Sequence, residues 1–417
     1  MPFGADGCII FVSSYTVNIM LSEKITRLKI LLIIYLGFIS LGLPDTVLGV
    51  AWPGMRLDLN APLSLAGILI SLTTVISVLA SLAAVRLMHK YHTGLILAAC
   101  ALTTATAMLG YSLAPALAFV VMFTLLFGIG QGAVDTAVNA YMARHYSARH
   151  MNWVHGFWGL GATGGPLIFT AAFALGYGWR EGYLSLFVIQ AALGLIFLRT
   201  LKWWTLPVPE KKEDLKKSAD LVLTEPKPGR AFFGVFFYFF YPGVEVVTGL
   251  WGASYLVETM GLRVVDAGSA LTLYWASLTL GRFAMGVAAG KLSNIAIIRA
   301  GLSLTSAGVL LANTANSAYN LIAAMGLVGL GLSPLYPSMM HETPKRVKPE
   351  QLEKTIGYQV GAALAGAAVI PALIGFILRR TELHYFPPLL LIFTLLMIVS
   401  HELSAGPKNK RMDNTQH

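Results

Sequence analysis

Charged side chains are scarce in this sequence of 417 residues. Asp, Glu, Lys and Arg together make up 12% of the chain, whereas hydrophobic residues make up 56%. A typical soluble domain carries about 25% charged residues, so this chain has too little charge to cover a water-facing surface. Length alone would suggest two or three soluble domains, but the long apolar runs indicate a polytopic membrane protein instead.

Cysteine is also scarce, and the common enzyme motifs are missing. Cys8 and Cys100 are the two cysteines, and they lie too far apart to suggest a disulfide framework or a metal site. There is no Walker A sequence, nucleophile elbow or paired Cys/His cluster, so we expect neither an enzyme, nor ATP as the energy source, nor a cofactor. The net charge of +10 is spread over short connectors rather than gathered in one patch, which argues against nucleic-acid binding.

Twelve apolar segments are long enough to cross a bilayer, whose hydrocarbon core requires about twenty residues of helix. Gly, Pro and charged residues separate them. The predicted spans are 30–56, 62–86, 93–112, 116–142, 153–176, 181–200, 231–257, 267–290, 295–314, 318–341, 355–378 and 384–403. The predicted fold is therefore an all-α membrane protein with twelve transmembrane helices.

Lys and Arg gather in the even-numbered connectors, for example Arg86, Arg144 and Lys345, with Arg379 and Arg380 as the exception. By the positive-inside rule we expect a multi-pass protein of the cytoplasmic (inner) membrane with both termini in the cytoplasm. The expected divisions are an N-terminal cytoplasmic or interfacial segment (1–27), an N-terminal six-helix bundle (28–201), a cytoplasmic linker (202–230), a C-terminal six-helix bundle (231–403) and a cytoplasmic tail (404–417).

The two halves of the chain share an internal repeat. Matching residues recur at an offset of 200 or 201: Asp45 with Glu245, Gly49 with Gly249, Gly130 with Gly331, and Gly156 with Gly357. The chain therefore reads as a duplicated six-helix unit with two pseudo-symmetric bundles in one orientation. This organisation resembles the parallel repeats of the major facilitator fold, in which the substrate site lies near mid-membrane between the halves.

Ionisable side chains inside the predicted spans are the first candidates for function. A charged residue at the bilayer centre costs ~2.5–3.5 kcal/mol on insertion scales, so it usually faces a bundle interior or a water-filled cavity. We expect Asp45, Asp135 and Glu245 to couple protons, although each acid could instead stabilise an interface. Arg282 inside a span, with Arg86 and Lys291 at span ends, is expected to act in structure or gating.

The segment GIGQGAVDTAVNAY, residues 128–141, places Gln131, Asp135 and Asn139 at intervals of four residues. This spacing puts the three side chains on one helix face. Small residues between them allow close packing, so the stripe could hold helices together. The alternative that we favour is a stripe that faces the cavity and handles protons and substrate.

Aromatic rings supply candidate walls for a sugar, because their apolar faces stack on sugar C–H groups. Aromatic residues are also common in membrane helices and interfacial belts, which leaves a purely structural role open for each. The predicted substrate-binding set is Gln131, Asp135, Asn139, His155, Trp158, Trp251, Tyr274, Trp275, Tyr336, Tyr358 and Gln359.

Several motifs resemble the fucose:proton symporter group of the major facilitator superfamily. They are GLPDTVLGVAWP, GIGQGAVDTAVNAY, NWVHGFWGLGATGGP, VEVVTGLWGASYL, LGRFAMG and GLGLSPLYPS. The resemblance implies that Asp45 and Asp135 handle substrate and proton, with Asn139 as the nearest match to a partner amide. The chain departs from the superfamily pattern in RLMHKYHTG, which lacks the usual acid, so gating contacts there must differ.

These observations predict a secondary active transporter that moves a small polar solute, with a sugar as the expected class, by proton-coupled alternating access. A proton-driven exporter of drugs, siderophores or other metabolites is the alternative. A membrane receptor that transports nothing is a third reading. The expected partners are the solute, protons and membrane lipid, and the expected oligomeric state is a monomer.

Overall fold

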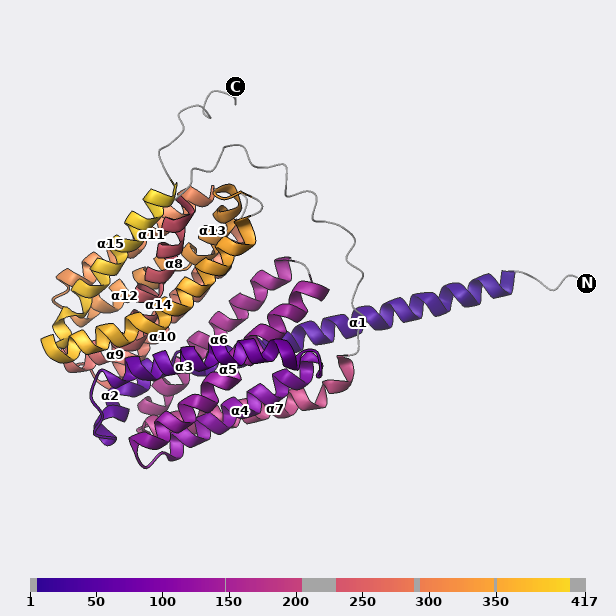
Figure 1. Cartoon of the computed structure of the whole chain (residues 1–417). Helices are drawn as coiled ribbons and strands as arrows, with labels where there is room; N and C mark the ends of the chain where they lie inside the picture. The colour runs from indigo at the N-terminus through magenta and orange to yellow at the C-terminus, as the bar shows by residue number, and fades with distance from the viewer. Residues whose placement is uncertain (1–5, 147, 205–229, 289–292, 349–350, 406–417) are drawn as a thin grey trace, which may run out of the picture.

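The computed structural model describes residues 6–146, 148–204, 230–288, 293–348 and 351–405. Within these ranges the chain is helical and contains no strand, which confirms the predicted all-α class. Figure 1 shows two helical bundles, the first built from α1 to α7 and the second from α8 to α15. Residues 1–5, the greater part of the predicted linker, Lys291 and the tail from 406 onward lie outside the described residues.

The helices of the N-terminal half are α1 (Asp6–Asp45), α2 (Leu48–Asp58), α3 (Leu65–Leu87), α4 (Thr93–Leu113), α5 (Leu117–His145), α6 (Ala148–Ala174) and α7 (Trp179–Arg199). Those of the C-terminal half are α8 (Arg230–Phe240), α9 (Pro242–Glu258), α10 (Val264–Ala288), α11 (Asn294–Thr314), α12 (Ala318–Leu332), α13 (Leu335–Glu342), α14 (Leu352–Thr381) and α15 (Phe386–Ala405). The early part of α1 projects away from the bundle as a single helix (Figure 1).

Eleven segments of the described chain are long and apolar enough to span a membrane. Three of them join two helices each, namely α1 with α2, α8 with α9, and α12 with α13. Helix α10 corresponds to the eighth predicted span (267–290), and its sequence includes Asp266, Arg282 and several Ser and Thr residues. It packs against α12 of its own half and against α6 of the other half, so the arrangement agrees with the predicted fold.

Three spans are interrupted close to a proline. The first breaks between Asp45 and Leu48, just after Pro44; the seventh breaks at Tyr241, before Pro242; and the tenth breaks at Ser333 and Pro334. Proline has no backbone N–H, so the carbonyl four residues earlier loses its helical partner. In a bilayer that carbonyl must find another donor within the protein.

Side chains from neighbouring helices supply the donors at Pro44 and at Pro166, a proline inside α6. The carbonyl of Ser40, freed by Pro44, accepts a hydrogen bond from the Gln190 side-chain amide of α7. The carbonyl of Ala162, freed by Pro166 in α6, accepts from the hydroxyl of Thr46 at 2.7 Å. The first break is therefore a hydrogen-bonded feature of the fold, and it leaves Asp45 at the end of α1.

The two halves meet closely at one end of the molecule. Gly49 and Gly249, which the repeat relates, pack backbone to backbone, and a Cβ added to Gly49 would lie 2.0 Å from the Gly249 carbonyl oxygen. Arg56 of α2 and Glu258 of α9 form an ion pair across the halves, with Nη2 and Oε2 2.6 Å apart. We call this region the closed end.

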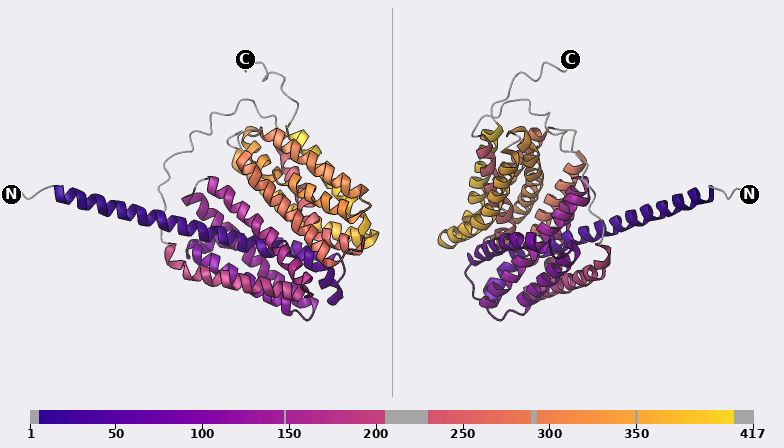
Figure 2. Two further views of the ribbon diagram at one scale, coloured as in Figure 1. Left: turned by 180° about the vertical axis from the view of Figure 1, so that it is seen from behind. Right: turned by 45° about the vertical axis from the view of Figure 1, so that its right-hand side comes forward.

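The opposite end is the one from which residues 204 and 230 lead into the linker, and we call it the linker end. Figures 1 and 2 show the two bundles converging near α2 and α9 and diverging toward the linker end. In that direction, a Cβ added to Gly357 or Gly361 of α14 would meet nothing within 4 Å. The halves are therefore in contact at the closed end and diverge at α14 toward the linker end, whereas α6 and α10 keep the halves in contact along their length, with Gly156 packed against Phe283.

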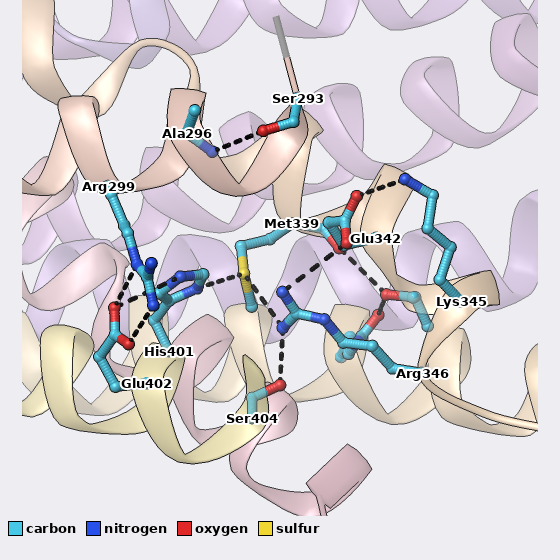
Figure 3. Close-up of polar contacts among 12 residues, drawn as sticks. Ser293, Ala296, Arg299, Met339, Glu342, Lys345, Arg346, His401, Glu402 and Ser404 are labelled. Atoms are coloured by element: carbon cyan, nitrogen blue, oxygen red, sulfur yellow. Dashed lines mark hydrogen bonds and ion pairs between the residues drawn. The ribbon is translucent and has the colours of Figure 1, made fainter. Parts of the chain in front are cut away.

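A polar network ties the C-terminal half together at the linker end (Figure 3). Arg299 of α11 makes two hydrogen bonds to Glu402 of α15, at 2.9 and 2.6 Å. Lys345 lies 2.7 Å from Glu342, and Arg346 donates to the Ser404 hydroxyl at 2.7 Å. We call this set the C-half network, and in it acids neutralise basic side chains.

The contact of Gly49 with Gly249 generates the first prediction. Gly49→Ala should lower the free energy of unfolding by about 1–3 kcal/mol, because the new methyl group forces α2 and α9 apart. Thermal unfolding of the purified protein measures the loss. Gly361→Ala is the matched control, since the same methyl group meets open space there, and it should leave stability unchanged or slightly raised. Equal stability of the two variants would contradict the prediction.

Candidate functional site

Helix α5 is fixed in place by close packing against α3. A Cβ at Gly132 would lie 1.9 Å from the Ser77 carbonyl oxygen. The hydroxyls of Ser77 and Ser81 donate to the carbonyls of Gly128 and Gly132, at 3.0 and 2.9 Å. The small residues of the GIGQG segment thus seat α5 against α3, and this contact sets the direction of the polar stripe.

The predicted stripe on α5 divides into two parts. Gln131 is buried, and its amide donates to the Leu41 carbonyl of α1 at 3.2 Å. Asp135 is exposed, and Asn139 donates to its carboxylate at 2.9 Å. Gln131 therefore holds two helices together, as the packing alternative anticipated, whereas Asp135 remains exposed with the half-buried Asn139 beside it.

Asp45 is also exposed, although it lies at the break in the middle of the first span. The polar side chains close enough to act on its carboxylate are those of Trp158, Gln131, Asp135 and Glu245. Because Glu245 belongs to the other half, Asp45 faces the space between the halves.

Glu245 sits in a different environment from the other two acids. Its carboxylate lies 2.9 Å from the guanidinium of Arg282 and accepts a hydrogen bond from the Tyr241 hydroxyl at 2.8 Å. Its backbone carbonyl accepts from the Tyr274 hydroxyl at 2.9 Å. Little of either charged side chain is exposed, since 14% of Glu245 and 19% of Arg282 remain accessible.

Trp158 connects this ion pair to the N-terminal half. The Arg282 guanidinium lies over the Trp158 ring, 5.4 Å from its centroid. Trp158 also meets Trp275 edge to face, with centroids 6.2 Å apart. Nearby, the hydroxyl of Thr279 donates to the Gly159 carbonyl at 2.9 Å. A guanidinium on an aromatic face gains about 2 kcal/mol when water is excluded, so this is a favourable contact between the halves.

The charges at the site do not balance. Glu245 has Arg282 as its partner, but no Lys or Arg of the described residues forms an ion pair with Asp45 or Asp135. Two uncompensated carboxylates at mid-membrane are costly when ionised. The arrangement therefore favours binding either protons or a solute that donates hydrogen bonds.

The structure brings several other predicted residues to the same place. Tyr336 is half-buried, and its hydroxyl lies close enough to Asp135, Glu245 and Arg282 to interact with their charges. His155 is exposed, contacts Phe38 edge to face and lies near Arg282. Together with Asp45, Asp135 and Trp158, these side chains gather from both halves.

The remaining predicted residues lie elsewhere. Trp251 is completely buried near the closed end, where its ring packs against Gly375. Gln359 is buried inside the C-terminal half, where it accepts from the Thr343 hydroxyl at 3.0 Å. Tyr358 is 57% exposed near Lys354. Arg86 is exposed at the end of α3. Trp251 and Gln359 therefore do not face the acids.

Tyr241 was missed by the sequence prediction. It is fully buried, and its hydroxyl fixes the Glu245 carboxylate. The sequence did contain a signal for this contact. Tyr241 lies four residues before Glu245, so the two side chains share one helix face when the helix continues through the break.

The comparison with family models agrees with this architecture. Residues 34–263 match the model of the Major Facilitator Superfamily, which covers more than half of the chain. The chain belongs to the Major Facilitator Superfamily. It is accordingly a multi-pass membrane transporter, and the predicted superfamily is confirmed.

A curated yeast protein also shares sequence with this chain. The chain is 26% identical over 342 residues to Bypass of stop codon protein 6 of Saccharomyces cerevisiae, with 71% of this chain and 65% of that protein covered. The chain thus spans about two thirds of the length of the yeast relative. That name does not state a substrate.

Solved structures of superfamily transporters share the fold at low identity. A bacterial homologue of the human lysosomal transporter Spinster, inward-facing and unoccupied, matches with a TM-score of 0.69 and 13% identity over 91% of this chain and 96% of that one. The nucleoside transporter NupG, as a D323A mutant, matches with a TM-score of 0.69 and 14% identity over 91% and 99%. The fucose:proton symporter subgroup stays a prediction.

The ion pair between Glu245 and Arg282 generates the second prediction. Glu245→Gln leaves a mostly buried guanidinium without its counter-charge, which should lower the free energy of unfolding by about 3 kcal/mol. Thermal unfolding in detergent measures the change. The double variant Glu245→Gln with Arg282→Gln removes both charges and should recover more than half of the loss. Additive losses in the double variant would show that the two side chains do not depend on each other.

Proposed function

We propose that this chain is a proton-coupled secondary transporter of a small polyhydroxylated solute, of the sugar or nucleoside kind. The observation that carries the proposal is the exposure of Asp45 and Asp135 at mid-membrane, between the halves and without a cationic partner. Carboxylates in such a position can take up a proton on one side of the membrane and release it on the other.

The three acids, Asp45, Asp135 and Glu245, are suited to different roles in the proposed transport cycle. Asp45 and Asp135 are the proposed proton carriers, because protonation removes an uncompensated charge from the membrane interior. Glu245 is held by Arg282 and Tyr241, so we assign it to the contact between the halves. Protons can drive transport only if they bind the inward-open and outward-open conformations with different affinity.

The solute class follows from the groups around the open acids. Asn139, Tyr336 and His155 provide hydrogen-bonding groups, and Trp158 offers an aromatic face. Uncompensated carboxylates repel anions and accept hydrogen bonds from hydroxyls, so a neutral, hydroxyl-rich solute fits best. The structural likeness to the nucleoside transporter NupG supports this class.

The separation of the halves supports alternating access. The basic connectors, which the positive-inside rule places in the cytoplasm, lie at the linker end. We therefore assign the closed end to the outside and the conformation to an inward-open state of a protein in the cytoplasmic membrane. The likeness to an inward-facing Spinster homologue is consistent with this assignment.

The proposed proton carriers can be tested in proteoliposomes with an imposed pH gradient and a panel of labelled sugars and nucleosides. The wild type should accumulate at least one of them. Asp135→Asn and Asp45→Asn should each reduce gradient-driven accumulation at least tenfold, because the neutral amide cannot carry a proton. Solute counterflow, which needs no net proton movement, should survive.

Asp266→Asn is the matched control, because Asp266 lies at the closed end and is paired with Arg263 on the exposed surface. It should leave accumulation unchanged. Full accumulation in both Asp45→Asn and Asp135→Asn would exclude the proposed coupling. Extrusion of drugs or siderophores by the wild type, with no uptake of any sugar or nucleoside, would favour the exporter instead.

The ion pair of Arg56 with Glu258 provides a test of alternating access. A partly exposed pair contributes about 0.2–1 kcal/mol, so Arg56→Gln should increase the outward-open population by up to about fivefold. Spin labels on α2 and α9 at the closed end would report the distance distribution. The charge swap Arg56→Glu with Glu258→Arg should restore the original distribution. An unchanged distribution in Arg56→Gln would show that the pair does not hold the closed end.

A further inference from the structure

The linker end of the N-terminal half contains a small cavity that the transport site does not use. Its volume is about 160 Å³, and it is lined by the start of α4, the end of α5 and the aromatic ring that follows α7. Pockets for drug-sized ligands measure about 300–1,000 Å³, so this one suits a much smaller group. Its lining residues are Met88, Tyr91, His92, Thr93, Tyr141, Arg144, His145 and Trp204.

The lining contains polar atoms without a partner. Within the described chain, the Tyr141 hydroxyl, the Trp204 indole nitrogen and the Nδ1 atom of His145 are buried and make no hydrogen bond. Tyr141 and Trp204 are 9% and 6% exposed, so each side chain keeps only a small accessible surface. A buried polar group left unpaired costs about 1–3 kcal/mol, and a bound ligand would remove that cost.

The other polar groups of the cavity are hydrogen-bond donors or positive charges. His92 caps α4, and its Nδ1 accepts from the backbone N–H of Leu95 at 3.3 Å. A neutral His92 must therefore carry its hydrogen on Nε2, which makes that atom a donor. The first turn of α4 adds a partial positive charge, and Arg144 adds a full one.

Acids are sparse at this end of the N-terminal half. Residues 23–29, 86–93, 141–150 and 199–204 contain many Lys, Arg and His residues and a single acid, Glu23. Burial and the nearby guanidinium groups of Arg27 and Arg144 lower the pKa of His145, which agrees with a positive environment. Basic side chains therefore outnumber acidic ones in these four segments.

The internal repeat shows that this imbalance is specific to one half. At the offset of 201 residues, Arg144 corresponds to Lys345, His145 to Arg346, and Tyr141 to Glu342. In the C-half network, Glu342 neutralises Lys345 and approaches Arg346 (Figure 3). The N-terminal half retains the basic positions, but it has Tyr141 at the position of the acid.

We infer that the cavity binds a phosphate group, supplied either by an anionic lipid headgroup or by free phosphate, with Arg144, His92 and Trp204 as donors. The bound phosphate would provide the negative charge that Glu342 provides in the other half. Basic pockets between membrane helices are known to suit lipid headgroups, and helix N-termini suit phosphate oxygens. The inference does not depend on the proposed roles of Asp45 and Asp135.

The test uses the full-length protein in detergent, titrated with inorganic phosphate and, separately, with phosphatidic acid in phosphatidylcholine mixed micelles, at constant ionic strength. Calorimetry gives the affinity, and the shift in unfolding temperature gives an independent measure. Arg144→Gln should weaken binding at least tenfold, because it removes a charge-assisted hydrogen bond. Trp204→Phe should weaken it less, because it removes one neutral donor.

Lys345→Gln is the matched control, since Lys345 is the repeat equivalent of Arg144 and already has Glu342 as its partner. It should bind as the wild type does. Phosphate binding that Arg144→Gln weakens would identify free phosphate as a ligand, and a response to phosphatidic acid alone would identify a lipid headgroup. Equal binding by wild type and Arg144→Gln in both titrations, or an equal loss in Lys345→Gln, would overturn the inference. Unfolding temperatures without ligand verify that each variant is folded.

Discussion

The arrangement of the transport site depends on the backbone contact of Gly49 with Gly249. The repeat places a glycine at the same point of the first and seventh spans, and the two helices touch there because neither has a side chain. With the halves joined at this point and by the pair of Arg56 with Glu258, they diverge toward the linker end. Asp45 and Asp135 thereby gain exposure at a depth where a packed bundle would bury them.

Proline breaks and side-chain donors make this geometry possible in a membrane. Pro44 ends α1 beside Asp45, and Gln190 hydrogen-bonds the carbonyl that the proline leaves free. The same solution recurs in α6, where Thr46 satisfies the carbonyl freed by Pro166. Irregular backbone can thus persist at mid-membrane, and it positions an acid at the interface between the halves.

The two halves have kept the same helices and distributed charge differently. At the transport site, Glu245 forms an ion pair with Arg282, whereas its repeat counterpart Asp45 forms no ion pair with a cation among the described residues. At the linker end the relation is reversed, since Glu342 neutralises the C-terminal half and Tyr141 occupies its place in the other. A duplicated scaffold has therefore left uncompensated negative charge at the centre and uncompensated positive charge at one end.

The sequence by itself determined the membrane class, the repeat, the superfamily and the acids inside the spans, because burial of apolar runs and the cost of intramembrane charge are local properties. Only the tertiary structure decided which residues meet. Periodicity put Gln131 and Asp135 on one face, but packing against α1 made Gln131 a helix-to-helix bond and left Asp135 open. Aromatic residues gave no such signal, so Trp158 and Trp251 looked alike until the contact between the halves placed one beside the acids and buried the other at the closed end.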